Sequence, residues 1–592
     1  MTQSTDHSTR QEHRKPVWKQ YLPVLEWLPA YRREDLIGDL LAGLIVAIML
    51  VPQGMAYALL AGLPPQVGLY ASIIPLILYG IFGTSRALAV GPVAIVSLLV
   101  ATGVSPLAAV GSAEYVQLAL TLALLVGIIQ AGMGLLRIGF LVNFLSHPVL
   151  AGFTSAAAIV IGFSQMKHLL GVSIPRSAHF YETVLVTLES AAKANALTLG
   201  IGIVSIGVLF YFKSGLGKQL KRWGVADALA VPITKSAPLV VVLLGTGLVW
   251  GLGWHESGGV AIVGNVPAGL PPLTMPTLDG DVWRLLLPTA LTISFVGYME
   301  SISVAKSLAS KRRQKVDANQ ELIGLGLANV GTALTGGYPV TGGFSRSVVN
   351  FTAGANTGLA SMVTAVLITL TVVFLTPLFY YLPNAVLAAI IMVAVIGLID
   401  VKTFRHVWRY NKADAASMMI TFAAVLIVGI ESGILIGVAA AVLLFIWRTS
   451  KPHVAVVGRL GDSEIYRNVL RYPVQTCPHA LVMRIDESLY FANTKYLEDT
   501  VLSHVADHPE IKQFVLVGTA VNFIDASALE TLESLIYGLR DADVELHLAA
   551  IKGPVLDRLQ AIGFVDKLGE DRIHMSTHDA MKALGCMERA SN

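Results

Sequence analysis

The sequence GGYPVTGGFSRS occupies residues 336–347 and has the form of an extended stretch that leads into a helix. A second stretch of the same form, ALAVGPVA, occupies residues 87–94. Each opens an apolar run, near 345–356 and 91–103, that is too short to cross a bilayer as an ordinary helix, which takes about 20 residues. We therefore expect two half-helices at matching positions in two halves of the chain. The alternative is a pair of re-entrant or surface loops.

The composition is that of a membrane protein. Of the 592 residues, 54% are hydrophobic and only 14% are charged, whereas a soluble domain carries about 25% charged residues. The mean hydropathy is +0.66. These values exclude a single soluble enzyme, a disordered scaffold and a disulfide-framed secreted domain. Because polar residues become frequent beyond about residue 448, we expect a cytoplasmic N-terminal segment without a signal peptide (1–35), a transmembrane domain (36–448) and a soluble cytoplasmic tail (453–592).

Fourteen membrane spans are expected, in two repeats of seven. The first repeat, about 36–252, holds spans near 39–58, 66–82, 91–103, 114–135, 147–168, 196–212 and 232–252. The second repeat, about 283–448, holds spans near 283–305, 317–334, 345–356, 359–376, 384–399, 415–430 and 432–448. Lys and Arg favour cytoplasmic loops; they cluster near 213–222, 311–315 and 402–412 and are missing from 253–282. Both termini are therefore expected in the cytoplasm.

Arg346 lies at the start of the second expected half-helix, in an otherwise apolar region. A charge inside a membrane tends to survive only with a partner or a role. A guanidinium matches the geometry of oxyanions, and a helix N-terminus adds free backbone donors. Together with the hydroxyl of Ser345, these groups predict an anion site. The alternatives are a structural ion pair and an arginine that reaches the membrane interface.

Glu300 is the only carboxylate in the middle of the expected span 283–305. A carboxylate in a low-dielectric site is suited to binding and releasing a proton. In the corresponding span of the first repeat, Gln53 and Tyr57 lie one turn apart on one helix face. Two alternatives remain for Glu300. It either pairs permanently with Arg346 or binds sodium together with nearby hydroxyls, which belong to Ser294, Ser301 and Ser303.

Interrupted spans at corresponding positions of two halves point to the midplane binding site of a transporter. Moving one charge against 100 mV costs about 2.3 kcal/mol, so a dianion entering a negative-inside cell faces about 4.6 kcal/mol. Accumulation of a dianion therefore requires a co-transported cation, and Glu300 is the expected carrier of that cation.

Three motifs carry a resemblance to a known family. VPQGMAYALLAGLPPQVGLYAS (51–72), GTSRALAVGPVA (83–94) and GGFSRS (342–347) resemble the sulfate permease (SulP) family of anion transporters. The resemblance covers nearly the whole chain. It implies a polytopic α-helical, uracil-permease-like fold, with fourteen spans as 7+7 inverted repeats, a core domain that moves against a gate domain, and a homodimer.

The same resemblance implies which residues form the anion pocket. These are Gln53, Tyr57, Ala94, Ser345 and Arg346. Glu300 matches the carboxylate of proton-coupled sulfate transporters that resemble the plant members. Bicarbonate members tend to have an aspartate there with sodium, and they typically lack the arginine. The combination of glutamate and arginine therefore favours sulfate with protons, with sodium less favoured.

The tail alternates between two patterns: apolar runs at 480–485, 513–518 and 544–550 predict strands, while 493–506, 526–541 and a segment from about Pro554 predict helices. This α/β alternation resembles a STAS domain. STAS-like proteins have an Asp-Ser-Ser-Gly loop whose second serine is phosphorylated. Here the loop is Asp525-Ala526-Ser527-Ala528, which makes Ser527 a candidate regulatory residue. The alternative is a plain helix start with Asp525 as its N-cap.

Cys477 and Cys586 are the two cysteines, and both lie in the tail. Their scarcity fits a reducing compartment, and their spacing indicates neither a metal site nor a structural disulfide. No Gly-rich loop ending in GK[ST] is present, so ATP-driven pumping is not expected. We expect no metal and no cofactor.

Together these features predict a secondary active anion transporter, not an enzyme, in the inner (plasma) membrane of a bacterium. We expect a proton-coupled sulfate symporter with elevator-like alternating access. Its partners are sulfate, protons and the lipid bilayer, and no nucleic acid. The alternatives within the family are sodium-coupled bicarbonate transport and proton-coupled C4-dicarboxylate transport. The alternatives of another class are an anion channel and a sensor.

Overall fold

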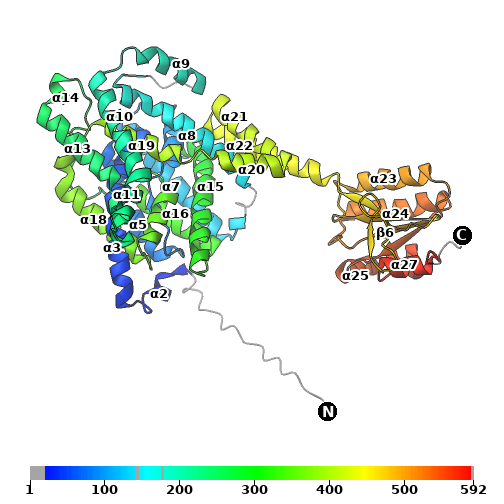
Figure 1. The fold of residues 1–592 in the computed structure, drawn as a ribbon. Coiled ribbons are helices and arrows are strands. Elements are labelled where there is room, and N and C mark those ends of the chain that lie inside the picture. The colour runs from blue at the N-terminus through cyan, green and yellow to red at the C-terminus, as the bar shows by residue number, and fades with distance from the viewer. Residues whose placement is uncertain (1–20, 141–145, 175–178, 588–592) are drawn as a thin grey trace. The chain divides into compact units, whose positions relative to one another are not determined.

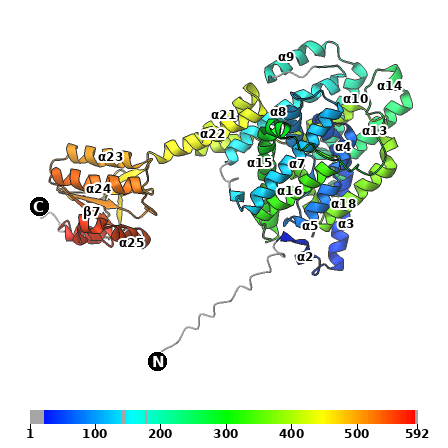
Figure 2. The same ribbon diagram turned by 180° about the vertical axis from the view of Figure 1, so that it is seen from behind.

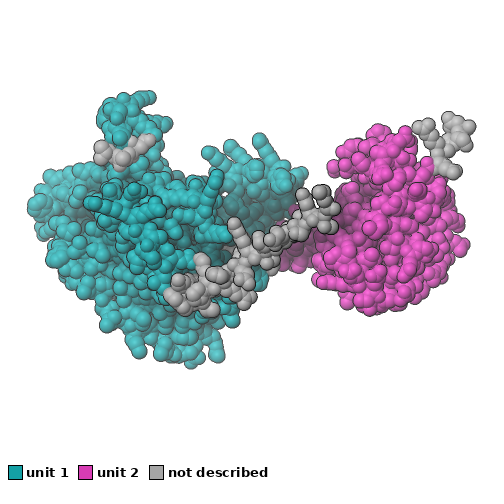
Figure 3. All heavy atoms as spheres, turned by 90° about the horizontal axis from the view of Figure 1, so that it is seen from below, with its two compact units in different colours: residues 1–441 teal, residues 442–592 magenta. Residues whose placement is uncertain are grey.

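The computed structural model describes residues 21–140, 146–174 and 179–587. Residues 1–20 of the expected N-terminal segment lie outside these ranges. The chain divides into two compact units, Met1–Ala441 and Val442–Asn592, which Figure 3 colours separately. The first unit is mainly helical, and the second contains a larger sheet.

The first half of the helical unit is coloured from blue to green in Figure 1. It contains the first half-helix. Its elements are α2 (Val24–Trp27), α3 (Arg33–Leu60), α4 (Pro65–Tyr70), α5 (Ile74–Phe82), β1 (Val90–Gly91), α6 (Ala94–Val104), α7 (Ala113–Leu135), α8 (His147–Leu170), α9 (Phe180–Ala191), α10 (Ala196–Phe210), the π-helix η2 (Tyr211–Leu216), α11 (Gly217–Arg222), α12 (Asp227–Lys235), α13 (Ala237–Leu252) and α14 (Trp254–Ser257).

The second half repeats this plan and contains the second half-helix. Its elements are α15 (Gly280–Lys311), α16 (Ala318–Leu334), β2 (Thr341–Gly342), α17 (Phe344–Thr352), α18 (Leu359–Leu370), the π-helix η3 (Thr371–Leu375), the 3-10 helix η4 (Thr376–Phe379), α19 (Asn384–Ile396), α20 (Val401–Tyr410), α21 (Lys412–Ile427) and α22 (Ile430–Thr449).

Nine helical stretches of the described residues are long and apolar enough to cross a membrane by length and composition. The other expected spans fall on the shorter helices α6, α13, α16, α17 and α21. The polytopic helical architecture is therefore confirmed, whereas the count of fourteen spans stays a prediction.

The two interrupted segments pair with each other. Strands β1 and β2 run antiparallel, with Val90 opposite Gly342 and Gly91 opposite Thr341. Gly91 has a φ of +149°, a backbone conformation that only glycine adopts readily. Helices α6 and α17 begin two or three residues after these strands. The predicted extended stretches and half-helices are therefore confirmed, in place of surface loops.

The helices of this unit form two packing groups. The first group comprises α3, α5, α6, α7, α15, α16, α17 and α18, and the second comprises α8, α10, α13, α19 and α21. Helices α7 and α16 lie side by side in Figures 1 and 2. A Cβ atom added at Gly127 of α7 would lie 2.8 Å from the carbonyl oxygen of Gly326 in α16. Glycines let membrane helices approach this closely, so Gly127 and Gly326 make the close packing of α7 and α16 possible. The two groups correspond to the expected core and gate domains.

The second unit is built on a six-stranded sheet. Its elements are β3 (Val454–Arg459), β4 (Tyr466–Asn468), β5 (Ala480–Ile485), α23 (Thr494–Asp507), β6 (Gln513–Val517), α24 (Ala526–Asp541), β7 (Glu545–Ala549), α25 (Gly553–Ala561), α26 (Phe564–Leu568), the 3-10 helix η5 (Glu570–Arg572), β8 (Ile573–His574) and α27 (Thr577–Ala583). The strand order is β4-β3-β5-β6-β7-β8, and β5 to β8 are parallel. The predicted strands and helices of the tail are confirmed to within one residue.

Apolar residues alternate between the two faces of this sheet. One face, with Met483 and Phe514, packs against α23, α24 and α25. The other face, with Val482 and Val515, packs against α27. The period of two along each strand therefore produces two separate cores.

The expectation of no disulfide in the tail is wrong. Cys477 and Cys586 are bonded, and their Cα atoms are 5.6 Å apart. They are separated by 109 residues, and they meet because α27 packs on the sheet and the chain after it returns to the segment before β5. Their spacing in the sequence carries no sign of this packing.

Candidate functional site

One cavity of about 480 Å³ brings the predicted site residues together. Gln53, Tyr57, Ala94, Ser345, Arg346 and Glu300 all line it. These residues come from α3, the N-terminus of α6, α15 and the N-terminus of α17. Residues of the second packing group, from α10, α13 and α19, line the other side. The cavity therefore lies where the two helix groups face each other.

Arg346 is held by backbone and not by a carboxylate. Its side chain is only 2% exposed, and its Nη1 donates a hydrogen bond to the carbonyl oxygen of Pro92. A Cβ atom added at Gly91 or Gly343 would lie 3.3 or 3.0 Å from Nη2. The guanidinium thus occupies space that two glycines leave open at the β1–β2 crossing.

The remaining donors of Arg346 are unused among the described residues. Nε and Nη2 are buried and have no hydrogen-bond partner there, and neither has Oε2 of Glu300. A buried charge without partners costs several kcal/mol. The predicted alternative, a permanent ion pair between Glu300 and Arg346, is not formed in the part of the chain that the structure describes. The cavity therefore contains a cation with free donors and a carboxylate with a free oxygen.

Two half-helix N-termini face this cavity. The N-cap residues of α6 and α17 are Val93 and Gly343, and neither helix start has a side-chain cap. The first amides of a helix have no partner within the helix, so they are available to an anion. Ala94 and Ser345 stand at these two starts, and both line the cavity. The small side chain of Ala94 leaves the amides accessible.

A chain of hydrogen bonds fixes β2 to α15 next to Glu300. The amide of Gly342 donates to the hydroxyl of Ser301 (2.8 Å), which lies 2.7 Å from the hydroxyl of Thr341. The hydroxyl of Thr341 donates to the carbonyl oxygen of Gly297 (2.6 Å). Ser301 must therefore donate to Thr341. Ser301 follows Glu300 directly, so this chain sets where the carboxylate stands.

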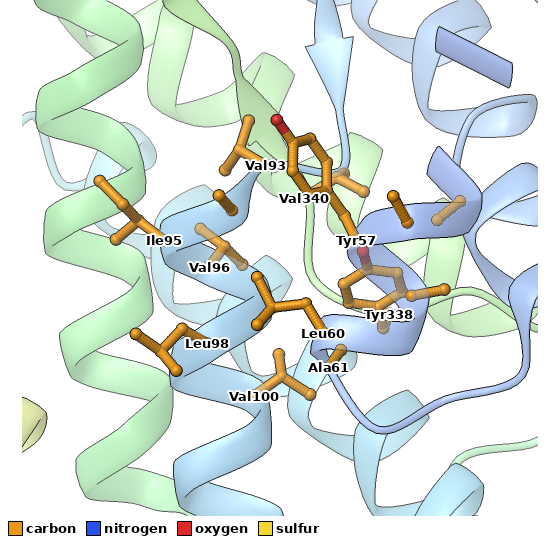
Figure 4. Close-up of a cluster of buried hydrophobic side chains, with 14 of the residues drawn as sticks. Tyr57, Leu60, Ala61, Val93, Ile95, Val96, Leu98, Val100, Tyr338 and Val340 are labelled. Carbon is orange, nitrogen blue, oxygen red and sulfur yellow. The ribbon is translucent and has the colours of Figure 1, made fainter. Parts of the chain in front are cut away.

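Tyr338 supports α6 in a similar way. Its hydroxyl lies 2.9 Å from the hydroxyl of Ser97. Figure 4 shows apolar side chains from the end of α3, from α6 and from Tyr338 and Val340 gathered in one cluster beside the site. Neither Tyr338 nor Ser97 is predicted from the sequence, because their pairing spans 241 residues. The one signal in the sequence that could have identified Ser97 is that a polar residue stands in a largely apolar half-helix.

The hydroxyls that suggested a sodium site do not gather around Glu300. Ser294 donates to the carbonyl oxygen of Ala290 in its own helix, and Ser301 is used as described above. Ser303 is exposed and does not line the cavity. This arrangement gives no support to sodium ligation by these residues.

Two other buried carboxylates have structural partners. Asp39 accepts hydrogen bonds from the amides of Asn356 and Thr357 (2.7 and 3.1 Å). Glu321 accepts from Tyr79 (2.7 Å) and from the amide of Thr84 (2.7 Å). Both are completely buried. Their oxygens hold loops to helices, in contrast to the free oxygen of Glu300.

Two lysines that were not predicted as site residues also face the cavity. Lys213 of η2 and Lys235 of α12 line it, and both side chains are exposed. Lys213 lies 3.5 Å from the carbonyl oxygen of Val393. The cavity is therefore positively charged at this end.

Ser527 belongs to the second unit and is exposed at the start of α24. Asp525 is the N-cap of α24, because its carboxylate accepts a hydrogen bond from the amide of Ala528 (2.8 Å). It also accepts from the amide of Phe491 (2.9 Å). The local geometry is explained by the cap, and a regulatory role of Ser527 stays a prediction.

Comparison with known proteins agrees with this fold. The family model described as "Sulfate permease family" matches residues 36–421, and a STAS domain model matches residues 471–580. The chain is 39% identical to "Sulfate transporter 4.1, chloroplastic" of Arabidopsis thaliana over 582 residues, which is 96% of this chain and 83% of the relative. It is 32% identical to "High affinity sulfate transporter 2" of Stylosanthes hamata, over 96% of this chain and 87% of the relative.

A solved structure matches nearly the whole chain. The murine Solute Carrier 26 family member A9 (Slc26a9) anion transporter, in the inward-facing state, matches with a TM-score of 0.88 at 26% identity. The match covers 98% of this chain and 97% of that chain. The family is made up of transporters and not of enzymes. The chain belongs to the sulfate permease family, and it is a multi-pass membrane transporter with a STAS domain.

Proposed function

We propose that this chain is a proton-coupled sulfate symporter, with residues 36–448 as its transport domain. The observation that carries the proposal is the cavity in which Arg346 keeps free donors beside a carboxylate with a free oxygen. A tetrahedral dianion fits this set of groups, because a guanidinium donates two parallel hydrogen bonds to an oxyanion. The names of the relatives, which are sulfate transporters, support the same substrate.

Sulfate binds between the two half-helix N-termini in this proposal. Arg346 supplies the charge, and the amides near Ala94 and Ser345 supply further donors. Gln53 and Tyr57 on α3 close the site from the side. Positive helix ends and a guanidinium offset the loss of water around the dianion.

Glu300 carries the proton. Its carboxylate lines the same cavity as the substrate site, so its negative charge repels a bound dianion when it is ionised. Protonation removes that repulsion and also reduces the net charge that moves across the membrane. Against about 100 mV, each positive charge carried with the dianion recovers about 2.3 kcal/mol. Binding of a proton and binding of sulfate therefore favour each other.

The loaded site moves as part of the first packing group. The polar residues of the site belong to α3, α6, α15 and α17, whereas α10, α13 and α19 contribute mainly apolar residues to the opposite wall. Because this wall is mainly apolar, few polar contacts break when one group slides past the other. This arrangement, with the polar site on one helix group and a mainly apolar wall on the other, supports elevator-like alternating access of a core domain against a gate domain.

The setting of the protein is part of the proposal. We place the chain in a bacterial inner membrane. Both termini lie on the cytoplasmic side, because Lys and Arg are concentrated in the loops expected on that side. We also propose a homodimer, as the family resemblance implies. Labelling of residues introduced near 253–282 and in the tail from each side of sealed cells tests the orientation.

Uptake of labelled sulfate by the purified chain in liposomes tests the function. With an inward proton gradient and no sodium, we expect accumulation above equilibrium that disappears when the gradient is removed. Accumulation of bicarbonate that requires sodium, in place of sulfate, would contradict the proposal. Full competition by succinate at concentrations where sulfate competes poorly would assign a C4-dicarboxylate instead.

A further inference from the structure

The disulfide of the second unit has an imidazole beside it. Nε2 of His479 lies 3.5 Å from Sγ of Cys477 and 3.4 Å from Sγ of Cys586. The same nitrogen lies 3.3 Å from the carbonyl oxygen of Leu584. The backbone that follows α27 therefore holds the imidazole at both sulfurs. Cys477 and Cys586 are partly exposed and His479 is exposed, so small molecules in solution reach the group.

The disulfide fastens one particular helix to the sheet. Cys586 lies three residues after α27, and Cys477 lies three residues before β5. Helix α27 has seven residues, which is too short for a helix to persist by itself. Its residues Ala580 and Met581 are buried against Val482 and Val515 of the sheet. The crosslink thus secures the short helix that covers one apolar face.

A permanent disulfide does not fit the side of the membrane on which we place the tail. Disulfides in the cytoplasm are usually transient, because thiol reductants keep cysteines reduced there. A partly exposed pair with an adjacent imidazole has the features of a bond that opens and closes, since the imidazole favours the thiolate that carries out exchange. We propose that Cys477 and Cys586 form a reversible redox modification site, closed by low-molecular-weight disulfides such as oxidised glutathione.

The closing reaction is an ordinary thiol–disulfide exchange. The thiolate of one cysteine attacks a sulfur of oxidised glutathione and releases one glutathione thiolate. The thiolate of the other cysteine then attacks the protein sulfur of the mixed disulfide and releases the second. Two protein thiols are oxidised, one glutathione disulfide is reduced to two thiols, and the two cysteine protons pass to the leaving groups. Nδ1 of His479, which lies 3.6 Å from Sγ of Cys477, accepts and returns these protons, because Nε2 donates to the carbonyl oxygen of Leu584.

Opening the bond releases α27. Without the crosslink, the helix is held only by noncovalent contacts, which are chiefly its few apolar contacts with the sheet. When the helix moves away, the face formed by Val482, Val515 and Val517 becomes accessible. Oxidation therefore covers this face, and reduction uncovers it. The redox state of the surrounding thiols therefore determines whether this face of the STAS domain is covered or exposed.

Hydrogen exchange on the full-length protein in nanodiscs tests this proposal. Samples are equilibrated in glutathione buffers of graded redox ratio, and free thiols are counted by mass after alkylation. We expect Cys477 and Cys586 to lose their thiols together, at one ratio. We also expect amides of 577–583 to exchange at least tenfold faster in the reduced sample.

Matched variants separate the parts of the proposal. Cys477→Ser and Cys586→Ser should both show the fast exchange of the reduced protein at every redox ratio. His479→Gln should close the bond at least fivefold more slowly and reach the same final exchange rate. Lys582→Gln, an exposed residue of α27, is the control and should behave like the unchanged chain. If a serine variant does not fold, the reduced unchanged protein provides the same comparison.

Three results would overturn the proposal. The first is that both thiols stay free in fully oxidised glutathione. The second is that the bond resists reduction until the domain unfolds, which would make it a purely structural crosslink. The third is a stoichiometric zinc ion held by the reduced sulfurs, because the group would then be a metal site.

Discussion

Arg346 donates a hydrogen bond to the carbonyl oxygen of Pro92 and not to the carboxylate of Glu300, although both charged residues line the same cavity. The backbone contact joins α17 to the crossing strand before α6. It fixes the guanidinium at the meeting point of the two half-helices and leaves Nε and Nη2 free among the described residues. Because the backbone holds the guanidinium of Arg346, its free donors stay available to a substrate whether Glu300 is protonated or ionised.

Sulfate binding should depend strongly on Arg346. We expect Arg346→Gln to weaken sulfate binding more than tenfold, because hydrogen bonds to a charged group contribute about 1.5–3 kcal/mol. Arg346→Lys keeps the charge but loses the paired donors, so its affinity for sulfate should lie between those of the unchanged protein and Arg346→Gln. Isothermal titration with sulfate gives the affinities. Arg86→Gln, at an exposed residue outside the cavity, is the control, and an unchanged affinity in Arg346→Gln would remove this residue from the site.

The lysines at the cavity should act on one side of the membrane. Lys213 and Lys235 raise the local concentration of anions by attraction. We expect the double variant Lys213→Gln/Lys235→Gln to raise KM for sulfate roughly threefold to tenfold on the side where this end of the cavity opens, with a smaller dependence on salt. Exchange assays in liposomes of known orientation measure both sides. Lys218→Gln, which does not line the cavity, should leave both values unchanged, and equal effects on the two sides would argue against the assignment.

A hydrogen bond between the two helix groups should control the transport rate. Thr289 of α15 donates to Glu431 of α22 (2.9 Å), and α22 packs closely against α21 of the second group, with Gly433 against Val425. Thr289→Val leaves the carboxylate without this donor, at a cost of about 1–3 kcal/mol. We therefore expect Vmax to change several-fold while the affinity for sulfate changes less than twofold. Glu431→Gln, which keeps an acceptor, should have the smaller effect, and a large change in affinity would contradict this account.

The half-helices could be predicted because their signals are local. Glycine and proline mark the extended stretches, and the apolar runs that follow are visibly too short to span a bilayer. Three of the strands of the tail, β5, β6 and β7, were equally accessible, since each is a short apolar run bounded by polar residues. Strands β3, β4 and β8 were not predicted. The N-cap at Asp525 also follows from local chemistry.

Contacts between distant residues could not be predicted in this way. Tyr338 and Ser97 meet across 241 residues, and Cys477 and Cys586 meet across 109. These pairings depend on how helices and strands pack, which no local pattern encodes. For the same reason the sequence left open whether Glu300 pairs with Arg346.

The stability of the second unit should fall in acid because of His547. Burial, together with the nearby positive charge of His574, lowers the pKa of His547 from 6.5 to about 4. Its Nε2 lies 2.7 Å from Oε1 of Gln513 and its Nδ1 lies 3.1 Å from Nε2 of His574, so a second proton on His547 faces another imidazole and not a carboxylate. The folded state binds this proton more weakly than the unfolded state. The full stability is therefore present above about pH 6.5 and is lost as the pH falls toward 4, by about 2–3 kcal/mol.

Pulse proteolysis of the full-length protein in urea measures this effect. The urea midpoint of the tail should fall between pH 7 and pH 5, and His547→Gln should make the midpoint less dependent on pH. His508→Gln, at an exposed histidine paired with Glu510, is the matched control. An unchanged pH profile in His547→Gln would assign the acid sensitivity to other groups.

The most direct test of the central claim compares two kinds of transport in Glu300→Gln. The variant mimics the protonated carboxylate, so labelled sulfate should still exchange for internal sulfate across liposome membranes at a rate within about tenfold of the unchanged protein, since the exchange step needs no change in charge at this residue. Uphill accumulation driven by an inward proton gradient should be lost, because no group is left to bind and release the proton. Accumulation by Glu300→Gln that still follows the proton gradient would contradict the account.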